Sequence, residues 1–265
     1  MVEDAGSYSF GEFESNQSEL NRLKAQATVA WDREKAILLR EGISQGMKVL
    51  DLACGPGFIS ESIYELVQPL GMVYGVDINE KLLAVANQQI NHENIFFQKE
   101  NCYELSFADN MFDFAYARFL FQHLEKPVEA LKEILKVLKP GGRFLVVDVD
   151  DAIFDIFPEP QGFSRFMTEA SQYQMKLGGD RRIGKKLGGF LKAVGFKNVS
   201  INIDVFTSEQ LGLKTFLDIT TGFKVELIPQ AKKDNAREML KIIYEDAARH
   251  NAFAFAGIYA VSGSK

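Results

Sequence analysis

The sequence predicts an α/β protein with a mostly parallel β-sheet covered by helices. Three observations support this fold class. Short apolar runs alternate with amphipathic runs of helical period, as in repeated βαβ units. The nearly continuous apolar run at residues 143–149 is typical of a central strand that is buried on both faces. With 265 residues, the chain is long enough to bury a full core.

Residues 47–79 contain the clearest βαβ unit. An apolar strand breaks at Gly55 and Gly57, an amphipathic helix follows, and a second apolar strand at residues 72–76 runs into Asp77. Glycine allows a ligand to approach the backbone closely, and the start of the helix favours an anionic group. Asp77 follows Gly57 by 20 residues, at the tip of the second strand, where a carboxylate can accept both hydroxyl protons of a ribose. The unit therefore predicts a nucleoside-binding site.

The glycine turn departs from a dinucleotide fingerprint, because Ser60 stands where G-x-G-x-x-G requires its third glycine. The stretch D-L-A-C-G-P-G, with G-V-D-I-N after it, resembles motif I and the acidic loop of class I S-adenosylmethionine-dependent methyltransferases. The stretches A-R-F-L-F-Q-H-L-E-K-P and L-K-P-G-G-R-F-L-V-V-D resemble that family's fourth strand and the segment leading into its fifth. The resemblance, to the small-molecule branch (methyltransferase type 11/25-like), implies a Rossmann-like seven-stranded sheet with an antiparallel last strand. It also implies S-adenosyl-L-methionine as the cofactor.

The same resemblance implies where that cofactor binds. Asn101 stands where the family usually has an acid facing the adenine amine, and its side-chain carbonyl can still accept that proton. A polar turn is the alternative interpretation of Asn101. Arg118 ends the fourth strand and either pairs with the cofactor carboxylate, orients neighbouring loops, or covers apolar surface. The expected cofactor-binding residues of the central motifs are Asp51, Ala53, Gly55, Gly57, Asp77, Ile78, Asn101, Cys102 and Arg118.

The N-terminal segment, residues 1–43, has apolar residues at helical spacing before the first strand. Composition alone favours simple packing on the sheet edge. The alternative is a lid, because the segment resembles the start Y-S-F-G-E-x-E-S-x-x-S-E-L-x-R-L-x-x-Q-A of one branch of small-molecule methyltransferases. That resemblance implies that Tyr8 and Gln26 contact the methionine end of the cofactor. It divides the chain into a lid at 1–43 and a methyltransferase domain at 44–265.

Two segments of the second half are expected to be helical insertions that cap the active site, at about 151–177 and 207–250. Residues 152–177 are rich in aromatic side chains, which either fill core or cover an apolar substrate. The long insertion at 207–250 separates the expected sixth and seventh strands, which are normally joined by a short turn. Residues 197–206 and 252–261 supply these strands.

No catalytic residue and no metal site is predicted. Methyl transfer from a sulfonium needs chiefly alignment and exclusion of water, so a base is not obligatory. His123 has a suitable ordinary pKa, but it lies in an apolar helix start, where a packed histidine is the commoner outcome. Asp148, Asp150 and Asp151 could attract magnesium, but the further partners of such a site are not recognisable. A role for one of these acids in facing substrate is favoured.

The composition limits the kinds of molecule that the protein is expected to bind. The net charge of −6 argues against nucleic acid, and no apolar run is long enough to span a membrane, so a cytoplasmic enzyme with a small-molecule acceptor is expected. The abundant phenylalanines, and the lack of an Asn-Pro-Pro-Tyr-like stretch, favour an apolar or aromatic acceptor. Cys54 and Cys102 are expected as small residues lining the pocket rather than as a disulfide. The acceptor, the methylated atom and the oligomeric state remain open.

Two other functions were weighed. A nicotinamide-dependent oxidoreductase should have the third glycine, and a short-chain enzyme should show Tyr-x-x-x-Lys, which this chain lacks. A non-catalytic regulator that binds S-adenosylmethionine stays open, because sequence does not separate it from an enzyme.

Overall fold

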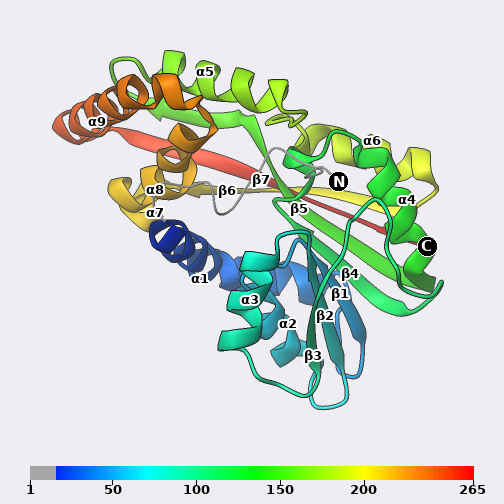
Figure 1. Cartoon of the computed structure of the whole chain (residues 1–265). Helices are drawn as coiled ribbons and strands as arrows, with labels where there is room; N and C mark the ends of the chain where they lie inside the picture. The colour runs from blue at the N-terminus through cyan, green and yellow to red at the C-terminus, as the bar shows by residue number, and fades with distance from the viewer. Residues whose placement is uncertain (1–15) are drawn as a thin grey trace.

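The computed structural model describes residues 16–265, which form a single β-sheet with helices packed against it (Figure 1). The strands have the order β3-β2-β1-β4-β5-β7-β6, in which β1 to β5 are parallel and β7 is antiparallel to both its neighbours. The expected seven-stranded, mostly parallel sheet with an antiparallel last strand is therefore confirmed. The strands are β1 (Lys48–Leu52), β2 (Met72–Asp77), β3 (Ile95–Lys99), β4 (Phe112–Arg118), β5 (Leu138–Phe157), β6 (Lys197–Thr207) and β7 (Phe253–Ser264).

The α-helices follow the chain order that the sequence pattern predicts, one before β1 and most of the others between strands. The short 3-10 helices η1 (Phe121–His123), η2 (Gly222–Leu227) and η3 (Gln230–Lys232) complete the connections. The α-helices are α1 (Asn16–Arg40), α2 (Phe58–Val67), α3 (Glu80–Gln89), α4 (Pro127–Val137), α5 (Phe163–Lys176), α6 (Gly184–Val194), α7 (Ser208–Leu211), α8 (Leu213–Thr220) and α9 (Lys233–Arg249).

The register of the parallel strands brings three strand ends to one edge of the sheet. Leu52, the last residue of β1, lies opposite Val76 of β2 on one side and Ala117 of β4 on the other. Parallel strands deliver their following loops to the same edge, and a ligand site forms where neighbouring connections diverge from a central strand. The loops after β1, β2 and β4 therefore meet at this edge.

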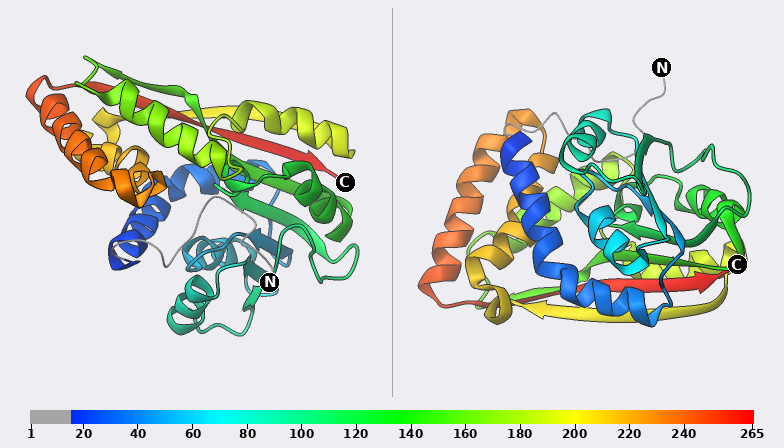
Figure 2. Two further views of the ribbon diagram at one scale, coloured as in Figure 1. Left: turned by 45° about the horizontal axis from the view of Figure 1, so that its top comes forward. Right: turned by 90° about the horizontal axis from the view of Figure 1, so that it is seen from below.

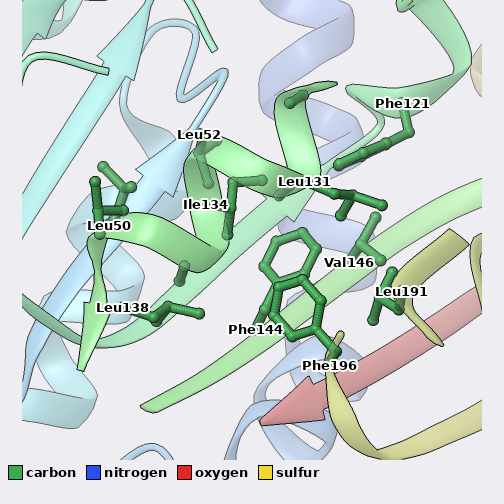
Figure 3. Close-up of a cluster of buried hydrophobic side chains, with 14 of the residues drawn as sticks. Leu50, Leu52, Phe121, Leu131, Ile134, Leu138, Phe144, Val146, Leu191 and Phe196 are labelled. Atoms are coloured by element: carbon green, nitrogen blue, oxygen red, sulfur yellow. The ribbon is translucent and has the colours of Figure 1, made fainter. Parts of the chain in front are cut away.

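The sheet is buried on both faces because successive strand residues point to opposite sides. Val49 of β1 packs with α1 and α2, whereas its neighbour Leu50 packs with α4 and α6. On the side of Leu50, Leu131 of α4 lies near Phe144 of β5 (Figure 3). The centroids of the Phe144 and Phe196 rings are 5.8 Å apart. The alternation gives the domain two separate apolar layers.

The expectation of a helix over residues 152–177 is wrong in its first part. β5 extends to Phe157, because Phe154 to Phe157 pair with the first residues of β7 after an irregularity that follows Val149. An antiparallel partner satisfies this backbone, so the aromatic residues alternate across a strand rather than line a helix. Helix α5 starts only at Phe163.

The extended ends of β5 and β7 carry a third apolar cluster that is separate from the two sheet layers. Helices α5, α8 and α9 pack there, at the end of the molecule away from α2 and α3 (Figure 2). The insertion after β6 thus folds as α7, α8, the 3-10 helices η2 and η3, and α9, in agreement with the helical insertion expected at about 207–250. We refer to α5, α7, α8, η2, η3 and α9 as the cap.

We expect Leu131→Ala to destabilise the fold by about 3 kcal/mol, because Leu131 is fully buried and its truncation leaves a cavity between α4 and the sheet. The measurement is the free energy of unfolding in urea. Leu70→Ala is the matched control, since Leu70 is 81% exposed and its loss should change stability by less than about 0.5 kcal/mol. Equal effects of the two substitutions would contradict this assignment of the core.

Candidate active site

A cavity of about 650 Å³ lies at the carboxyl ends of β1, β2 and β4. Its walls come from the loops after these strands, from one side of α1, and from the cap. This volume lies within the range of about 300–1,000 Å³ that is usual for sites binding cofactors and small molecules. The cavity is therefore the candidate active site.

The turn between β1 and α2 has a backbone that most residues avoid. Ala53, Gly55 and Gly57 have φ angles of 57°, 54° and 80°. A Cβ atom on Gly57 would lie 2.6 Å from the Phe97 ring, so this glycine is required for packing. At Gly55 the nearest neighbour of such an atom, Leu82, is 4.0 Å away, so here the backbone faces the open cavity. Gly57 is therefore required for packing, whereas Gly55 leaves the backbone accessible to a ligand.

Asp77 is fixed at the tip of β2 by backbone donors. The Gly55 amide donates to Oδ2 at 2.9 Å, and the Asn79 amide donates to Oδ1 at 2.8 Å. Burial raises the pKa of Asp77, and these two amides partly offset that rise. Each oxygen has a further lone pair, so a carboxylate held this way can still accept two hydroxyl protons.

Asp51 lies at the same end of the cavity. Ser60 donates to its Oδ2 at 2.6 Å, so Ser60, which occupies the place of the missing third glycine, orients a carboxyl group. Burial raises the pKa of Asp51 to about 7, with a further rise from the neighbouring charge of Asp77. Two carboxyl groups thus give this end of the cavity an acidic character.

Arg118 connects β4 to α1. Its Nε donates to both carboxylate oxygens of Glu34, at 2.8 and 2.9 Å, and its Nη2 donates to the backbone oxygen of Gln26 at 3.2 Å. Tyr116 also donates to Glu34, at 2.8 Å. The Arg118 side chain is only 10% exposed, so it does not cover outer surface. It orients α1 along the cavity wall, where the Gln26 side chain also lies.

The loop after β3 supplies the last of the expected residues. Asn101 lines the cavity, and its Oδ1 accepts from the Tyr103 amide at 2.9 Å, so it also stabilises a turn. Burial raises the pKa of the Cys102 thiol to about 12 and also raises that of Cys54, which keeps both thiols protonated. Both cysteines line the cavity and both are free.

The structure brings almost all of the expected cofactor-binding residues to one cavity. Gly57 lies just behind the lining, and Tyr8 lies outside the described residues. The expected residues that line the cavity are Gln26, Asp51, Ala53, Gly55, Asp77, Ile78, Asn101, Cys102 and Arg118.

His123 lines the cavity as well, but its environment disfavours a charged imidazole. Burial, together with the charges of Arg181 and Arg22, lowers the pKa of His123 to about 3. The Nδ1 atom lies 3.3 Å from Nε2 of Gln174, a residue of α5. His123 is therefore packed within the protein, and its surroundings favour the neutral imidazole.

The three acids at the end of the apolar run in β5 face different surroundings. Asp150 and Asp151 line the cavity, whereas Asp148 lies outside the lining and accepts from the Gln122 and Val149 amides at 3.1 and 2.8 Å. Burial raises the pKa of Asp148 to about 7. Within residues 16–265, no group of three or more metal-ligating side chains is found.

Sequence reasoning missed the residues at the end of the cavity opposite Asp77. Arg22, Arg181 and Phe223 line that end, each from a different part of the chain. Arg22 lies within the helical pattern of the N-terminal segment, and Arg181 lies in the basic stretch G-G-D-R-R-I-G-K-K, to which the sequence gives no specific role. The only available signal was their charge and size, and neither says which distant segments the fold brings together.

Comparison with known proteins identifies the central segment. Residues 50–146 match the family model described as methyltransferase domain. The central segment of the chain is therefore similar to a methyltransferase domain. The predicted relation to class I methyltransferases is thereby confirmed, and the domain covers β1 to the middle of β5, including the glycine turn, Asp77 and Arg118.

Curated relatives of the methyltransferase domain include quinone-modifying enzymes. The ubiquinone/menaquinone biosynthesis C-methyltransferase UbiE of Haemophilus ducreyi is 36% identical over 129 residues, which is 47% of this chain and 50% of that protein. The demethylmenaquinone methyltransferase of Staphylococcus aureus is 31% identical over 126 residues, which is 47% of this chain and 52% of that protein. The chain therefore matches only about half the length of these relatives.

Solved structures share the fold over more of the chain. Phosphoethanolamine N-methyltransferase 2 of Haemonchus contortus, in complex with S-adenosyl-L-methionine, has a TM-score of 0.61 at 19% identity, covering 96% of this chain and 60% of that one. A SAM-dependent methyltransferase of Aquifex aeolicus has a TM-score of 0.54 at 23% identity, covering 72% and 92%. These likenesses confirm the Rossmann-like fold.

We expect Asp51→Asn to stabilise the ligand-free protein at alkaline pH. The folded-state pKa of Asp51 is raised from 3.8 to about 7, so its contribution to stability is full below pH 3.8 and is lost as the pH rises through about 7. Asparagine does not ionise and therefore avoids that loss. In urea titrations, the advantage of the variant should grow by about 4 kcal/mol between roughly pH 4 and pH 8.

Asp109→Asn provides the control for this comparison, because Asp109 is exposed. Its stability relative to the unmodified protein should not change over the same pH interval. An advantage of Asp51→Asn that is independent of pH would show that the Asp51 carboxyl is not perturbed by burial.

Proposed function

We propose that the protein is an enzyme that transfers a methyl group from S-adenosyl-L-methionine to a small organic acceptor by in-line displacement. The observation that carries the proposal is the Asp77 carboxylate, which the Gly55 amide fixes beside an open glycine backbone at the strand ends. The match to a methyltransferase domain and the fold of the solved relatives support it. Because the curated relatives are matched over only about half their length, activity and acceptor are proposals for this chain.

The residues at the acidic end fit such a cofactor. Asp77 would hold the ribose hydroxyls, Ile78 and the Asn101 loop would hold the adenine, and the carboxyl group of Asp51 would favour the positively charged methionine end. The cofactor, when bound, supplies a methyl group that its sulfonium already activates. The protein's task is to orient the acceptor and exclude water, which can account for much of the rate enhancement.

The lid role of the N-terminal segment is a further proposal. Residues of α1 line the cavity between the cofactor end and the cap, and the Glu34–Arg118 ion pair at 2.8 Å fixes this helix to β4. We propose that α1 closes the site over the methionine end of the cofactor, with Gln26 facing it. The prediction for Tyr8 remains open, since Tyr8 lies outside the described residues.

The acceptor side of the cavity supports an apolar or aromatic compound. The cap and the strand ends contribute large apolar side chains to this side of the cavity. Such a lining is usual for sites that bind small molecules. None of the helices in residues 16–265 is long and apolar enough to cross a membrane. The cytoplasmic location remains a prediction. The apolar residues of this side are Phe119, Leu120, Phe154, Ile219, Phe223 and Leu227.

We expect Asp77→Ala to weaken the binding of S-adenosylmethionine at least about tenfold, because the ribose loses a charged hydrogen-bond acceptor. Isothermal titration calorimetry measures the affinity. Asp77→Asn retains an oxygen that can accept from Gly55, so it should lose less. Asp109→Ala, at an exposed position, is the control and should bind as the unmodified protein does. Equal affinity of the Asp77→Ala variant would remove Asp77 from the ribose site.

Methyl transfer itself separates the enzyme from a cofactor-binding regulator. We expect incubation with methyl-labelled S-adenosylmethionine and a panel of phenols, quinols and aromatic acids to give a product heavier by one labelled methyl group, detected by mass spectrometry. Asp77→Ala should form at most about a tenth as much product at a cofactor concentration below saturation. Tight cofactor binding with no product from any compound would favour the regulator.

A further inference from the structure

The end of the cavity opposite Asp77 is built around one aromatic ring. Phe223 belongs to η2 in the cap, and the Cζ atoms of Arg22 and Arg181 lie 4.7 and 5.6 Å from its centroid. Arg22 comes from α1, and Arg181 comes from the segment between α5 and α6. All three side chains line the cavity, so two guanidinium groups reach the same place from separate elements.

Positive charge at this end exceeds the negative charge that balances it. Asp151 is shared by two cations, because Arg181 donates to it through Nη2 and Nε, at 2.7 and 3.1 Å, and Lys224 donates through Nζ at 2.9 Å. The side chains of Arg181 and Lys224 are only 5% and 2% exposed. Burial, and then the charge of Arg181, lowers the pKa of Lys224 to about 8, so the lysine is still largely protonated at neutral pH.

Within residues 16–265, most of the other charged side chains at this end have partners of their own, and Asp150 lies 3.9 Å from Lys185. Arg22 has its own partner in Glu19, at 2.6 Å, and Glu226 is paired with Lys233. The group formed by Arg22, Arg181, Lys224, Glu19 and Asp151 therefore carries one surplus positive charge. The nearby Asp148 carboxyl, whose pKa burial raises to about 7, offsets this charge only in part at neutral pH. A buried charge without a partner is costly, so this end favours a ligand that brings a negative charge.

The cavity is thus polarised, with the carboxyl groups of Asp51 and Asp77 at the proposed cofactor end and the surplus cation at the other. Arg22 donates to Glu19 through Nε and Nη2 and keeps both N–H groups of Nη1 for a ligand carboxylate. Arg181 donates to Asp151 through Nε and Nη2 and to Gln122 through Nη1, so one N–H group on each of its two Nη atoms remains for the ligand. Building on the proposed function, we infer that the methyl acceptor is an aromatic or apolar carboxylic acid whose carboxylate is bound by Arg22 and Arg181 beside Phe223. The ring of the acceptor then lies among the apolar side chains between the two ends.

The test compares aromatic acids with their neutral amides. The probes are 4-hydroxybenzoate and 1-hydroxy-2-naphthoate, each beside its carboxamide, titrated into the full-length protein saturated with S-adenosylhomocysteine. The better-fitting acid should bind at least about tenfold more tightly than its amide, because only the acid forms charged hydrogen bonds. The Arg181→Gln and Arg22→Gln variants should lose this preference while binding the amide unchanged.

The chain offers a matched control for each arginine. Arg182→Gln makes the same change beside Arg181 but at an exposed position, and Lys24→Gln removes an exposed cation of α1 near Arg22. Both controls should keep the preference for the acid. Arg181→Lys, which retains the charge, should keep part of it, and the melting temperature of each variant confirms that it is folded.

Three results would overturn the inference. The first is equal affinity for acid and amide in both probe pairs, which includes the absence of any binding. The second is a preference that survives both arginine variants. The third is a tenfold loss of S-adenosylmethionine affinity in these variants, which would assign the arginines to the cofactor. Failure of the proposed function gives a different result from failure of this inference. If the proposed function is wrong, the unmodified protein does not bind S-adenosylmethionine. The acid and amide titrations can still be made in the absence of S-adenosylhomocysteine, so they test the arginines separately.

Discussion

The hydrogen bond from the Gly55 amide to the Asp77 carboxylate is the contact on which the arrangement of the site depends. It joins the turn after β1 to the tip of β2, and so determines both the path of the glycine backbone and the orientation of the acid. The parallel register of β1 with β2 brings these groups within reach of each other. Their burial makes the contact strong, because an unpaired amide or carboxylate there would be costly.

A second set of contacts places the walls of the cavity relative to that contact. Glu34 is a buried residue of α1, and its carboxylate accepts hydrogen bonds from both Arg118 and Tyr116 of β4. The helix that precedes the sheet in sequence is therefore positioned by the strand that neighbours β1. On the opposite side, Asp151 plays a comparable part, since it joins the end of β5 to Arg181 and to Lys224 of the cap.

Much of the fold and of the cofactor end could be predicted from the sequence, because the signals there are local. The turn at Gly55, its spacing to Asp77 and the apolar strands lie within one continuous stretch, and the structure confirms the sheet that they imply. The strand over Phe154 to Phe157 was predicted as a helix, because its pairing with β7 involves residues about a hundred positions away. The aromatic content of that segment fits both structures.

The acceptor end was not predictable for the same physical reason. Arg22, Arg181 and Phe223 acquire meaning only through tertiary contacts between α1, the segment before α6 and the cap. Arg118 illustrates an intermediate case: its place at the end of β4 was expected, but its ion pair with Glu34 requires knowledge of where α1 lies. Local patterns thus identify the half of the site that a single βαβ unit builds.

Strands β5 and β7 extend beyond the other strands and carry the cap, which determines which parts of the protein can change during evolution. These two strands run from the central sheet into the cap and pair with each other on both sides of an irregularity between Val149 and Phe154, so both halves of the site lie on the same pair of strands. Side chains on α5, α8 and α9 can change while the glycine turn stays in place. Substitutions in the cap can therefore alter the proposed acceptor side of the cavity while the proposed cofactor side is unchanged.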